Sequence, residues 1–306
     1  MDLLVVGNMA YDTICNVKFL PEKNQATLID DLDVTPYFGG CAGNVAVIAG
    51  GLGIKTGIFS IVDKNFRNSK YLKQLKKYNI DITHLYYSKT SIAHSFVFTN
   101  PNEDQQIFYY PGASSELNKY TFDFKDYDYV HFAAGEISVY HKFMKKAVKN
   151  GCIVSFDPGQ ELFHRPFKEQ ILSCFPYVSY LFLNHHEACF LLKSIKKSNI
   201  EDLFFEKTDA IIVSNGEKGC TIHSKDQIIK IPAVRPSKLM DPTGAGDAHR
   251  AGFLVGLIRG YGLEQSGKIA SATSSFVIEE KGAQTAVPSW NMIKGRMCEL
   301  SESTLL

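Results

Sequence analysis

Short β-branched or aromatic runs alternate along this chain with amphipathic helical patterns, and this alternation restricts the fold more than any other feature. The apolar runs have the length of buried strands, and the segments between them repeat apolar side chains with the helical period. Such alternation builds a mainly parallel sheet covered on both faces, with ligands at the carboxyl ends of its strands. The predicted strands are residues 3–6, 56–61, 129–132, 153–156, 180–183 and 210–213, and the predicted helices are residues 44–52, 66–78, 139–149, 166–174, 187–192 and 200–205.

Two segments interrupt the alternation. Residues 26–38 and 92–110 have the pattern of antiparallel strands, and the second pair turns at residues 100–104, where Pro, Asn and Asp gather. A chain of 306 residues with 45% hydrophobic content has enough apolar surface for one large core. We therefore predict one α/β domain over residues 1–306 with a small additional sheet.

Charge and cysteine usage exclude several classes of function. The 33 basic and 32 acidic residues leave a formal charge of +1, so no strong field favours nucleic acid or an anionic membrane. The seven cysteines are scattered, without Cys-x-x-Cys spacing, and are typical of buried thiols in a reducing compartment. The N-terminus shows no basic leader, and no apolar run reaches the about 18 residues of a membrane span. We expect a cytoplasmic protein with a small-molecule partner.

A glycine turn precedes a strongly apolar helical segment near the C-terminus. Gly244 and Gly246 allow a tight turn that directs successive backbone N–H groups to one point, and a helix beginning near Ala245 adds the positive end of its dipole. Such a site binds an anion. A carboxylate at Asp247 is unfavourable there unless it takes a proton from a hydroxyl that attacks a bound phosphate. The alternative is a structural Asp that only complements the helix dipole.

The chain contains neither the usual P-loop nor the catalytic loop of protein kinases, so a phosphate site would be built from Gly244, Ala245 and Gly246. The string Asp-Pro-Thr-Gly-Ala-Gly-Asp-Ala at residues 241–248, followed by Ala-Gly-Phe, resembles the C-terminal signature of the ribokinase-like (PfkB) family of sugar and nucleoside kinases. Other segments resemble the family's motifs in the family's order, and the resemblance covers essentially the whole chain. These segments are residues 5–12, 39–46, 184–187, 213–219 and 281–284.

The resemblance implies a three-layer α/β/α sandwich with a mainly parallel central sheet and a small β-sheet lid over the substrate. Two insertions, at about residues 10–40 and 91–113, would form the lid. A carboxylate at Asp12 would accept hydrogen bonds from two adjacent sugar hydroxyls. Asn44 and the backbone of Gly39 and Gly40 would complete this cradle.

The resemblance also implies ATP and Mg²⁺ as cofactors. Asn184 and Glu187, three residues apart at a helix start, would hold Mg²⁺ largely through water, because this ion loses its hydration shell reluctantly. Asp241 would help to hold a monovalent cation such as K⁺. The residues implied in ATP binding are Asn184, Ser214, Gly216, Gly219 and Gly282.

Each of these roles has a structural alternative. Asp12 could be a solvated turn residue, and Asn184 with Glu187 could be an ordinary helix cap. His185 and His186 are adjacent, so they point in different directions on a helix, and we interpret them as surface or packing residues.

Several strings resemble the microbial adenosine and nucleoside kinase branch of the family more than ribokinase or fructokinase. They include Pro242, Arg250, residues 156–160 and residues 108–113. Within them, Phe108, Tyr110 and Gln160 are predicted substrate contacts. Phe108, Tyr109 or Tyr110 would lie near a purine base, because aromatic faces stack on flat rings. His249 departs from this branch, which usually has Phe at that position.

Other functions remain open from the sequence. A sugar kinase of the ribokinase or fructokinase type is one alternative, and a sugar- or nucleoside-binding protein without catalysis is another. Retention of Asp247, Gly244, Gly246, Asn184 and Glu187 argues against the non-catalytic protein. The lid is a candidate surface for a homodimer.

Overall fold

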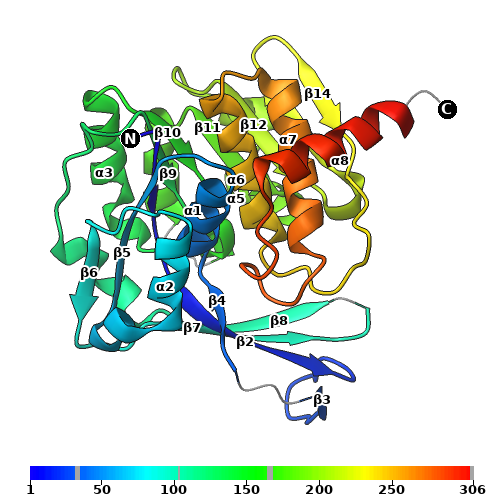
Figure 1. Ribbon diagram of the computed structural model, residues 1–306. Coiled ribbons are helices and arrows are strands. Elements are labelled where there is room, and N and C mark those ends of the chain that lie inside the picture. Colours follow the sequence, from blue (N-terminus) through cyan, green and yellow to red (C-terminus); the bar gives the residue numbers. More distant parts are fainter. Residues whose placement is uncertain (32–34, 103, 164–167, 304–306) are drawn as a thin grey trace.

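A computed structural model of the protein describes residues 1–31, 35–102, 104–163 and 168–303 (Figure 1). In this part of the chain the main sheet consists of β1 (Leu3–Val6), β5 (Thr56–Asp63), β6 (Leu85–Ser88), β9 (Tyr129–Phe132), β10 (Ile153–Phe156), β11 (Tyr180–Asn184), β12 (Ala210–Ser214), β13 (Cys220–Ser224) and β14 (Ile228–Ile231). The strand order is β14-β13-β12-β11-β10-β9-β1-β5-β6. Pairing is parallel from β12 to β6, and β13 and β14 add antiparallel strands at one edge. The predicted parallel sheet is confirmed.

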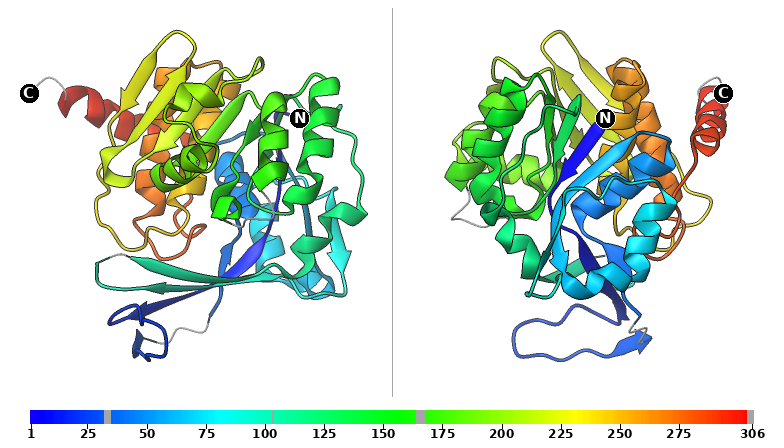
Figure 2. Two further views of the ribbon diagram at one scale, coloured as in Figure 1. Left: turned by 180° about the vertical axis from the view of Figure 1, so that it is seen from behind. Right: turned by 60° about the vertical axis from the view of Figure 1, so that its left-hand side comes forward.

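Helices cover both faces of this sheet (Figure 2). They are α1 (Cys41–Gly51), α2 (Lys70–Lys77), α3 (Tyr140–Lys149), α4 (Lys168–Cys174), α5 (His185–Ser194), α6 (Ala245–Ile258), α7 (Leu263–Val277) and α8 (Trp290–Ser303). Successive side chains of a strand point to opposite faces, so Leu3 and Val5 of β1 join the core of α1 and α6, whereas Leu4 and Val6 join the core of α3, α4 and α5. The predicted three-layer sandwich is confirmed. Within the described residues, no helix combines the length and apolar composition needed to cross a membrane.

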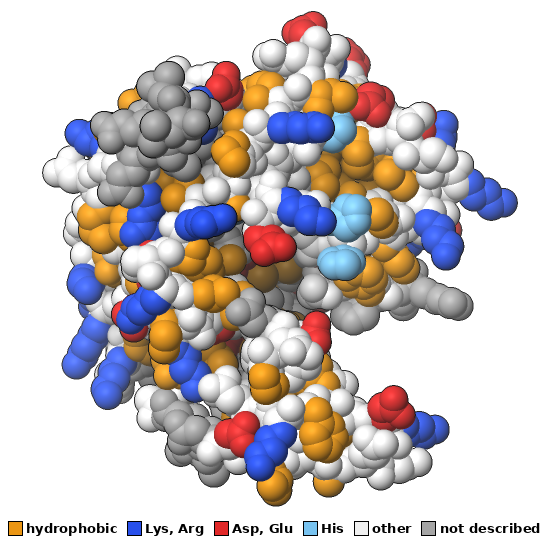
Figure 3. Space-filling model, turned by 90° about the vertical axis from the view of Figure 1, so that its right-hand side faces the viewer, with side chains coloured by type: hydrophobic (Ala, Val, Ile, Leu, Met, Phe, Trp, Pro, Cys, Tyr) orange, Lys and Arg blue, Asp and Glu red, His pale blue; other side chains and the backbone are white. Residues whose placement is uncertain are grey.

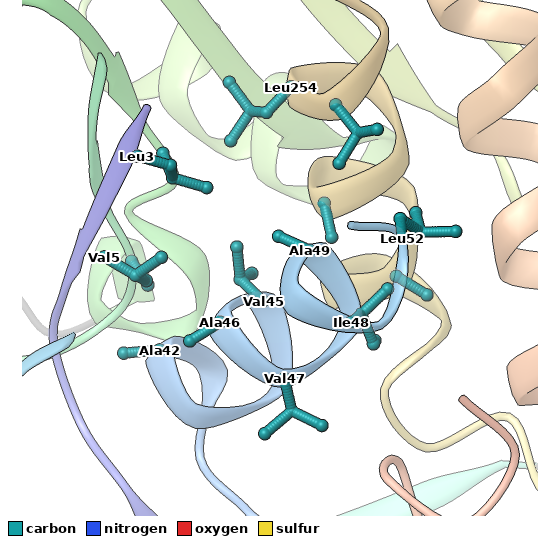
Figure 4. Close-up of a cluster of buried hydrophobic side chains, with 14 of the residues drawn as sticks. Leu3, Val5, Ala42, Val45, Ala46, Val47, Ile48, Ala49, Leu52 and Leu254 are labelled. Carbon is teal, nitrogen blue, oxygen red and sulfur yellow. The ribbon is translucent and has the colours of Figure 1, made fainter. Parts of the chain in front are cut away.

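Helix α1 packs against β1 on one side and against its neighbour α6 on the other (Figure 4). It begins at Cys41, earlier than the predicted residue 44. The reason is a cap supplied by another part of the chain. The side-chain oxygen of Asn8 accepts the N–H of Cys41 at 2.9 Å, and the carbonyl of Asn8 accepts the N–H of Ala42 at 3.1 Å. These bonds satisfy N–H groups that a helix start otherwise leaves without partners.

Other predicted helices are shorter than expected. The segment 66–78 is divided, because a 3₁₀ turn over Lys64–Asn68 comes first and the side chain of Ser69 then caps α2 by accepting the N–H of Leu72. The segment 200–205 forms only a 3₁₀ turn over Ile200–Leu203. Helix α4 begins at Lys168, and residues 166 and 167 of its predicted span lie outside the described residues.

The lid is a second sheet at the carboxyl edge of the main sheet (Figure 1). It contains β2 (Ala10–Val17), β3 (Ile29–Asp31), β4 (Tyr37–Gly39), β7 (Ala93–Thr99) and β8 (Gln105–Tyr110). Strands β7 and β8 pair antiparallel, as expected, and β3 and β4 both pair antiparallel to β2. The pairing of β2 with β7 is parallel, which the sequence did not predict. Residues 32–34 of the first lid segment, and Glu103 of the predicted turn, lie outside the described residues.

Helices α6 and α7 approach each other closely through glycines of α6. A Cβ on Gly252 would lie 2.8 Å from the Cα of Ala270, and one on Gly256 would lie 2.8 Å from the Cα of Ser266. Real Cβ atoms do not approach backbone so closely, so these positions require glycine. The contact fixes α6, and with it the glycine turn that precedes this helix.

We expect Gly252→Ala to lower the free energy of unfolding by about 1–3 kcal/mol, because the added methyl group overpacks the α6–α7 contact. Urea unfolding would measure the change. Gly295→Ala is the matched control, since Gly295 is an exposed residue of α8 with no atom within 4 Å of an added Cβ. That variant should gain up to about 1 kcal/mol from the lower flexibility of its unfolded chain. Equal effects at the two positions would contradict the packing argument.

Candidate active site

The glycine turn lies at the N-terminus of α6, as predicted. Gly244 is the residue before the helix and has a left-handed φ of 80°. A Cβ there would lie 2.3 Å from the Cβ of Ala283, so conformation and space both require glycine. The N–H of Ala245 donates to the carbonyl of Pro242 at 3.1 Å and closes the turn. An anion would therefore be bound mainly by the N–H groups of Gly244 and Gly246 rather than by that of Ala245.

Asp247 is held in place by a chain of side-chain hydrogen bonds. The amide of Asn44 donates to Oδ2 of Asp247 at 2.7 Å, and the amide of Gln284 donates to Oδ1 of Asn44 at 2.9 Å. Gln284 also donates to the hydroxyl of Tyr71 at 2.6 Å, which in turn donates to the carbonyl of Gly39 at 2.7 Å. Asn44 thus orients the carboxylate, a role that the sequence did not predict. Gln284 belongs to a motif found in the sequence but was not predicted as a site residue.

The environment of Asp247 suits a proton acceptor. Burial raises the pKa of its carboxyl from 3.8 to about 6, with a further increase from Asp157, while the Asn44 hydrogen bond and Arg250 act in the opposite direction. The ideal pKa of a general base lies near the working pH. A carboxyl with a pKa of about 6 is ionised at neutral pH and still accepts a proton readily.

Asp12 lies on β2 against the two glycines that the sequence assigned to substrate. Its side chain is 5% exposed. A Cβ on Gly39 would lie 1.9 Å from Oδ2 of Asp12, and one on Gly40 would lie 2.5 Å from the backbone N of Ala10. Burial raises the pKa of Asp12 to about 7, and Asp247 contributes to the rise. Asp12 is therefore not a solvated turn residue, and it lies close enough to Asp247 to influence it.

Asn184 and Glu187 form a reciprocal cap at the start of α5. The backbone N–H of Asn184 donates to Oε2 of Glu187 at 2.7 Å, and the N–H of Glu187 donates to Oδ1 of Asn184 at 2.9 Å. Glu187 is 3% exposed, and burial raises the pKa of its carboxyl to about 7. The structural alternative of a helix cap is thus confirmed. The remaining carboxylate oxygen, Oε1, is the atom of Glu187 that this cap does not use.

The residues that the sequence assigned to ATP binding, apart from Gly282, lie at the carboxyl ends of β11 and β12 or just after β12. Asn184 and Ser214 are direct partners across β11 and β12. Gly216 has a φ of 52° and nothing within 4 Å of an added Cβ, whereas a Cβ on Gly219 would lie 2.0 Å from the carbonyl of Ile231. Gly219 is therefore required by packing, and Gly216 borders open space.

Asp241 links the glycine turn to the segment that contains Gly282. Its Oδ1 accepts the N–H of Thr243 at 2.9 Å, and its Oδ2 accepts the N–H of Gly282 at 2.8 Å. The side chain is 4% exposed. Gly282 has a φ of 86°, and a Cβ there would lie 2.4 Å from the ring of Tyr37. Both residues thus have a structural role beside the predicted site.

One face of the lid sheet points to the glycine turn and the other points away. The side chain of Gln105 donates to the hydroxyl of Thr243 at 3.4 Å, and Tyr109 accepts a hydrogen bond from the side chain of Asn8 at 2.9 Å. Because side chains alternate along a strand, Phe108 and Tyr110 of β8 lie on the opposite face. Of the three aromatic residues predicted to lie near a purine base, Phe108 and Tyr110 thus point away from the glycine turn, and Tyr109 is on the face that points to it.

A cavity of about 250 Å³ lies beside Tyr109, between the lid and the main sheet. Figure 3 shows that the lid and the body are separated by an open cleft. Glu136 and Glu161 line the cavity together with Tyr109. Gln160, a predicted substrate contact, is exposed, while Glu161 next to it lines the cavity. Glu136 carries no sequence signal that could have identified it.

We expect Asp247→Asn to be more stable than the wild type at about pH 7.5, by about 1 kcal/mol or more, since one unit of pKa shift is worth about 1.4 kcal/mol. The folded protein raises the pKa of Asp247 to about 6, so ionisation destabilises it progressively above about pH 4 and fully above about pH 6. An Asn side chain still accepts the Asn44 hydrogen bond. Thermal unfolding at pH 7.5 and pH 4 would show the gain only at the higher pH, and a gain of equal size at pH 4 would contradict this cause.

Comparisons with known proteins agree with this geometry. A family model for the pfkB family of carbohydrate kinases matches residues 1–290. A nucleoside kinase of Methanocaldococcus jannaschii is 40% identical over 297 residues, which cover 95% of this chain and 95% of that protein. The crystal structure of a nucleoside kinase of M. jannaschii, an archaeal member of the ribokinase family, is 38% identical with a TM-score of 0.87, over 98% of this chain and 99% of its own.

The structure of a nucleoside kinase of Burkholderia thailandensis in complex with inosine is also similar. It has a TM-score of 0.87 at 25% identity, over 97% of this chain and 96% of its own. The family match and the M. jannaschii relative each cover nearly the whole chain. The chain therefore belongs to the pfkB family of carbohydrate kinases and is a phosphotransferase that acts on a hydroxyl group.

Proposed function

We propose that this protein transfers the γ-phosphate of ATP to a hydroxymethyl group of an adenosine-like nucleoside. The observation that carries the proposal is the position of Asp247, on the first turn of α6 beside a glycine turn and near the buried carboxyl of Asp12. Asp247 would take the proton of the acceptor hydroxyl while the turn stabilises negative charge on the transferring phosphoryl group. An ATP-consuming reaction also agrees with a cytoplasmic location.

Substrate positioning in this proposal depends on the lid. Asp12 lies on β2, where it would accept hydrogen bonds from two adjacent ribose hydroxyls. The hydrogen bond from Asn44 fixes the Asp247 carboxylate before the hydroxyl arrives, so little reorganisation is needed during the reaction. The nearby cleft would be closed to water once substrate is bound, because water would otherwise compete with the acceptor for the phosphoryl group.

Magnesium fits the residues as an ion held mainly by water and phosphate. In the described part of the chain, no group of three or more His, Cys, Asp or Glu side chains is placed to hold a metal ion. Mg²⁺ commonly keeps several waters and uses one or two carboxylates together with phosphates. Asn184 and Glu187 would hold such an ion through water, and the ion would neutralise charge on the ATP phosphates. Asp241 stays a candidate for K⁺, with one lone pair of each oxygen already used by a backbone N–H.

A nucleoside is favoured over a free sugar as the acceptor. Two relatives, at 40% and 34% identity over nearly the whole chain, are named nucleoside kinases, and the B. thailandensis nucleoside kinase at 25% identity was solved in complex with inosine. The cavity beside Tyr109 adds space next to the Asp12 cradle, lined by an aromatic ring and by carboxylates that accept N–H groups of a base. Free ribose would leave this space empty.

The outer face of the lid is a candidate homodimer surface. Phe96, Phe108 and Tyr110 lie together on it and are 43%, 56% and 47% exposed. Exposed apolar patches of this kind on a soluble domain commonly mark an interface. We propose that a second copy of this chain covers the patch.

Asp247→Asn should lower turnover by about a hundredfold or more, the scale of a positioned general base. Binding of Mg·ATP, measured by calorimetry, should stay close to that of the wild type because the glycine turn is unchanged. Asp226→Asn, in the exposed hairpin between β13 and β14, is the control and should keep full turnover. Wild-type turnover in Asp247→Asn would remove this residue from the mechanism.

Tyr109→Ala should lower catalytic efficiency for adenosine by about fivefold, the equivalent of about 1 kcal/mol for a lost ring contact, and should leave free ribose unaffected. The matched variant Phe108→Ala changes the other face of the same strand. It should keep efficiency for adenosine and weaken self-association in sedimentation. A larger effect of Phe108→Ala on adenosine would contradict the assignment of the faces, and a wild type that prefers free ribose or fructose would contradict the nucleoside substrate.

A further inference from the structure

A buried ion pair lies directly behind the glycine turn. Nε of Arg250 is 2.6 Å from Oδ2 of Asp157, and the two side chains are 5% and 7% exposed. Arg250 follows Asp247 by three residues on α6, while Asp157 follows β10 at the carboxyl edge of the main sheet. Oδ1 of Asp157 also accepts the N–H of Gly159 at 3.0 Å. The pair therefore connects the first turn of α6 to the sheet.

The guanidinium of Arg250 also lies beside the turn. Its Nη1 lies 2.8 Å from the position that a Cβ on Gly246 would occupy. A side chain at position 246 would have to displace the guanidinium, so this contact favours glycine there. The positive charge thus lies next to the turn whose N–H groups would bind the transferring phosphate. Since Asp157 holds it there, Arg250 acts on the substrate only through the turn and Asp247.

The guanidinium of Arg250 changes the pKa of the buried carboxyls around it. Arg250 lowers the pKa of Asp247 and of Glu187, whereas Asp157 raises both. The groups that face Asp247 from other elements are the carboxyls of Asp12, Asp157 and Glu187, the thiol of Cys41 and the phenol of Tyr71.

The other titratable groups near Arg250 add no positive charge. Burial, with Arg250 as a second cause, lowers the pKa of His131 and His249 to about 3, so both imidazoles are neutral. Burial raises the pKa of the Cys41 thiol and the Tyr71 phenol well above their ordinary values, so these groups are neutral as well. Arg250 therefore balances a cluster of carboxylates.

We propose that Arg250 is a positioning residue for phosphoryl transfer, whose guanidinium, held by Asp157, places a fixed positive charge behind the glycine turn and beside Asp247. This inference rests on the proposed role of Asp247 as the base. Arginine suits the role because its guanidinium stays charged when buried. The pair would thus serve the reaction as well as the fold.

The test is the pH profile of kcat/KM with Mg·ATP and the wild type's best nucleoside. Without the positive charge, Arg250→Met should move the acidic limb of the profile to higher pH. Without the neighbouring negative charge, Asp157→Asn should move it to lower pH. A displacement of one pH unit changes the rate below the limb about tenfold. Opposite displacements from the two halves of one ion pair are not expected if the pair only supports the fold.

Arg259→Met is the matched control. Arg259 follows the C-terminus of the same helix, about 18 Å from Asp247 at 1.5 Å per residue, and its guanidinium donates to the carbonyl of Leu52. Its loss should lower stability and leave the acidic limb unchanged.

The proposal would be overturned if Arg250→Met and Asp157→Asn lowered activity without moving the acidic limb of the pH profile. If Arg250→Met does not fold, Arg250→Lys and Asp157→Asn decide the question. Arg250→Lys keeps the positive charge, so it should leave the acidic limb near its wild-type pH while kcat falls. An unmoved acidic limb in Asp157→Asn would overturn the proposal. Failure of the underlying function is distinguishable, because Asp247→Asn would then retain wild-type turnover.

Discussion

The hydrogen bond from Asn44 to Asp247 is the interaction on which the candidate site depends, because it joins the N-termini of α1 and α6. Both helices direct their positive ends to the carboxyl edge of the sheet, and each start is built by contacts from elsewhere in the chain. Asn8 caps α1, while Ala283 packs against the turn that opens α6. The close contact of α6 with α7 fixes the position of this bond relative to the sheet.

The same arrangement creates a conflict between stability and activity. Asp12, Glu187 and Asp247 all have raised pKa values because they are buried near one another. Their ionisation at neutral pH therefore lowers the free energy of unfolding. Arg250 offsets part of this repulsion, since it is paired with Asp157 and faces the other carboxylates. A cluster of this kind is typical of a functional site, where charges are held in positions that stability alone would not favour.

The lid shows how strand geometry separates neighbouring residues onto two faces, for which we propose different functions. Tyr109 faces the cleft and bonds to Asn8, while Phe108 and Tyr110 face outward with Phe96. In the proposed function one face would serve the substrate, and the other would be covered by a second copy of the chain. Three consecutive aromatic residues therefore belong to two different surfaces, and the sequence does not show which residue belongs to which surface.

The sequence by itself determined the alternation of strands and helices, the glycine turn and the place of Asp247 after it, because these depend on local periodicity and on backbone conformations that neighbouring residues impose. It also located Asp12, Gly39 and Gly40 as one group through the family motifs. Only the tertiary structure decided that Asn44 bonds to Asp247, that Arg250 pairs with Asp157, and that Phe108 and Tyr110 face away from the cleft. The physical reason is distance along the chain. Asn44 and Asp247 are 203 residues apart, and the face that a lid strand presents depends on how the lid sheet docks, which local sequence does not encode.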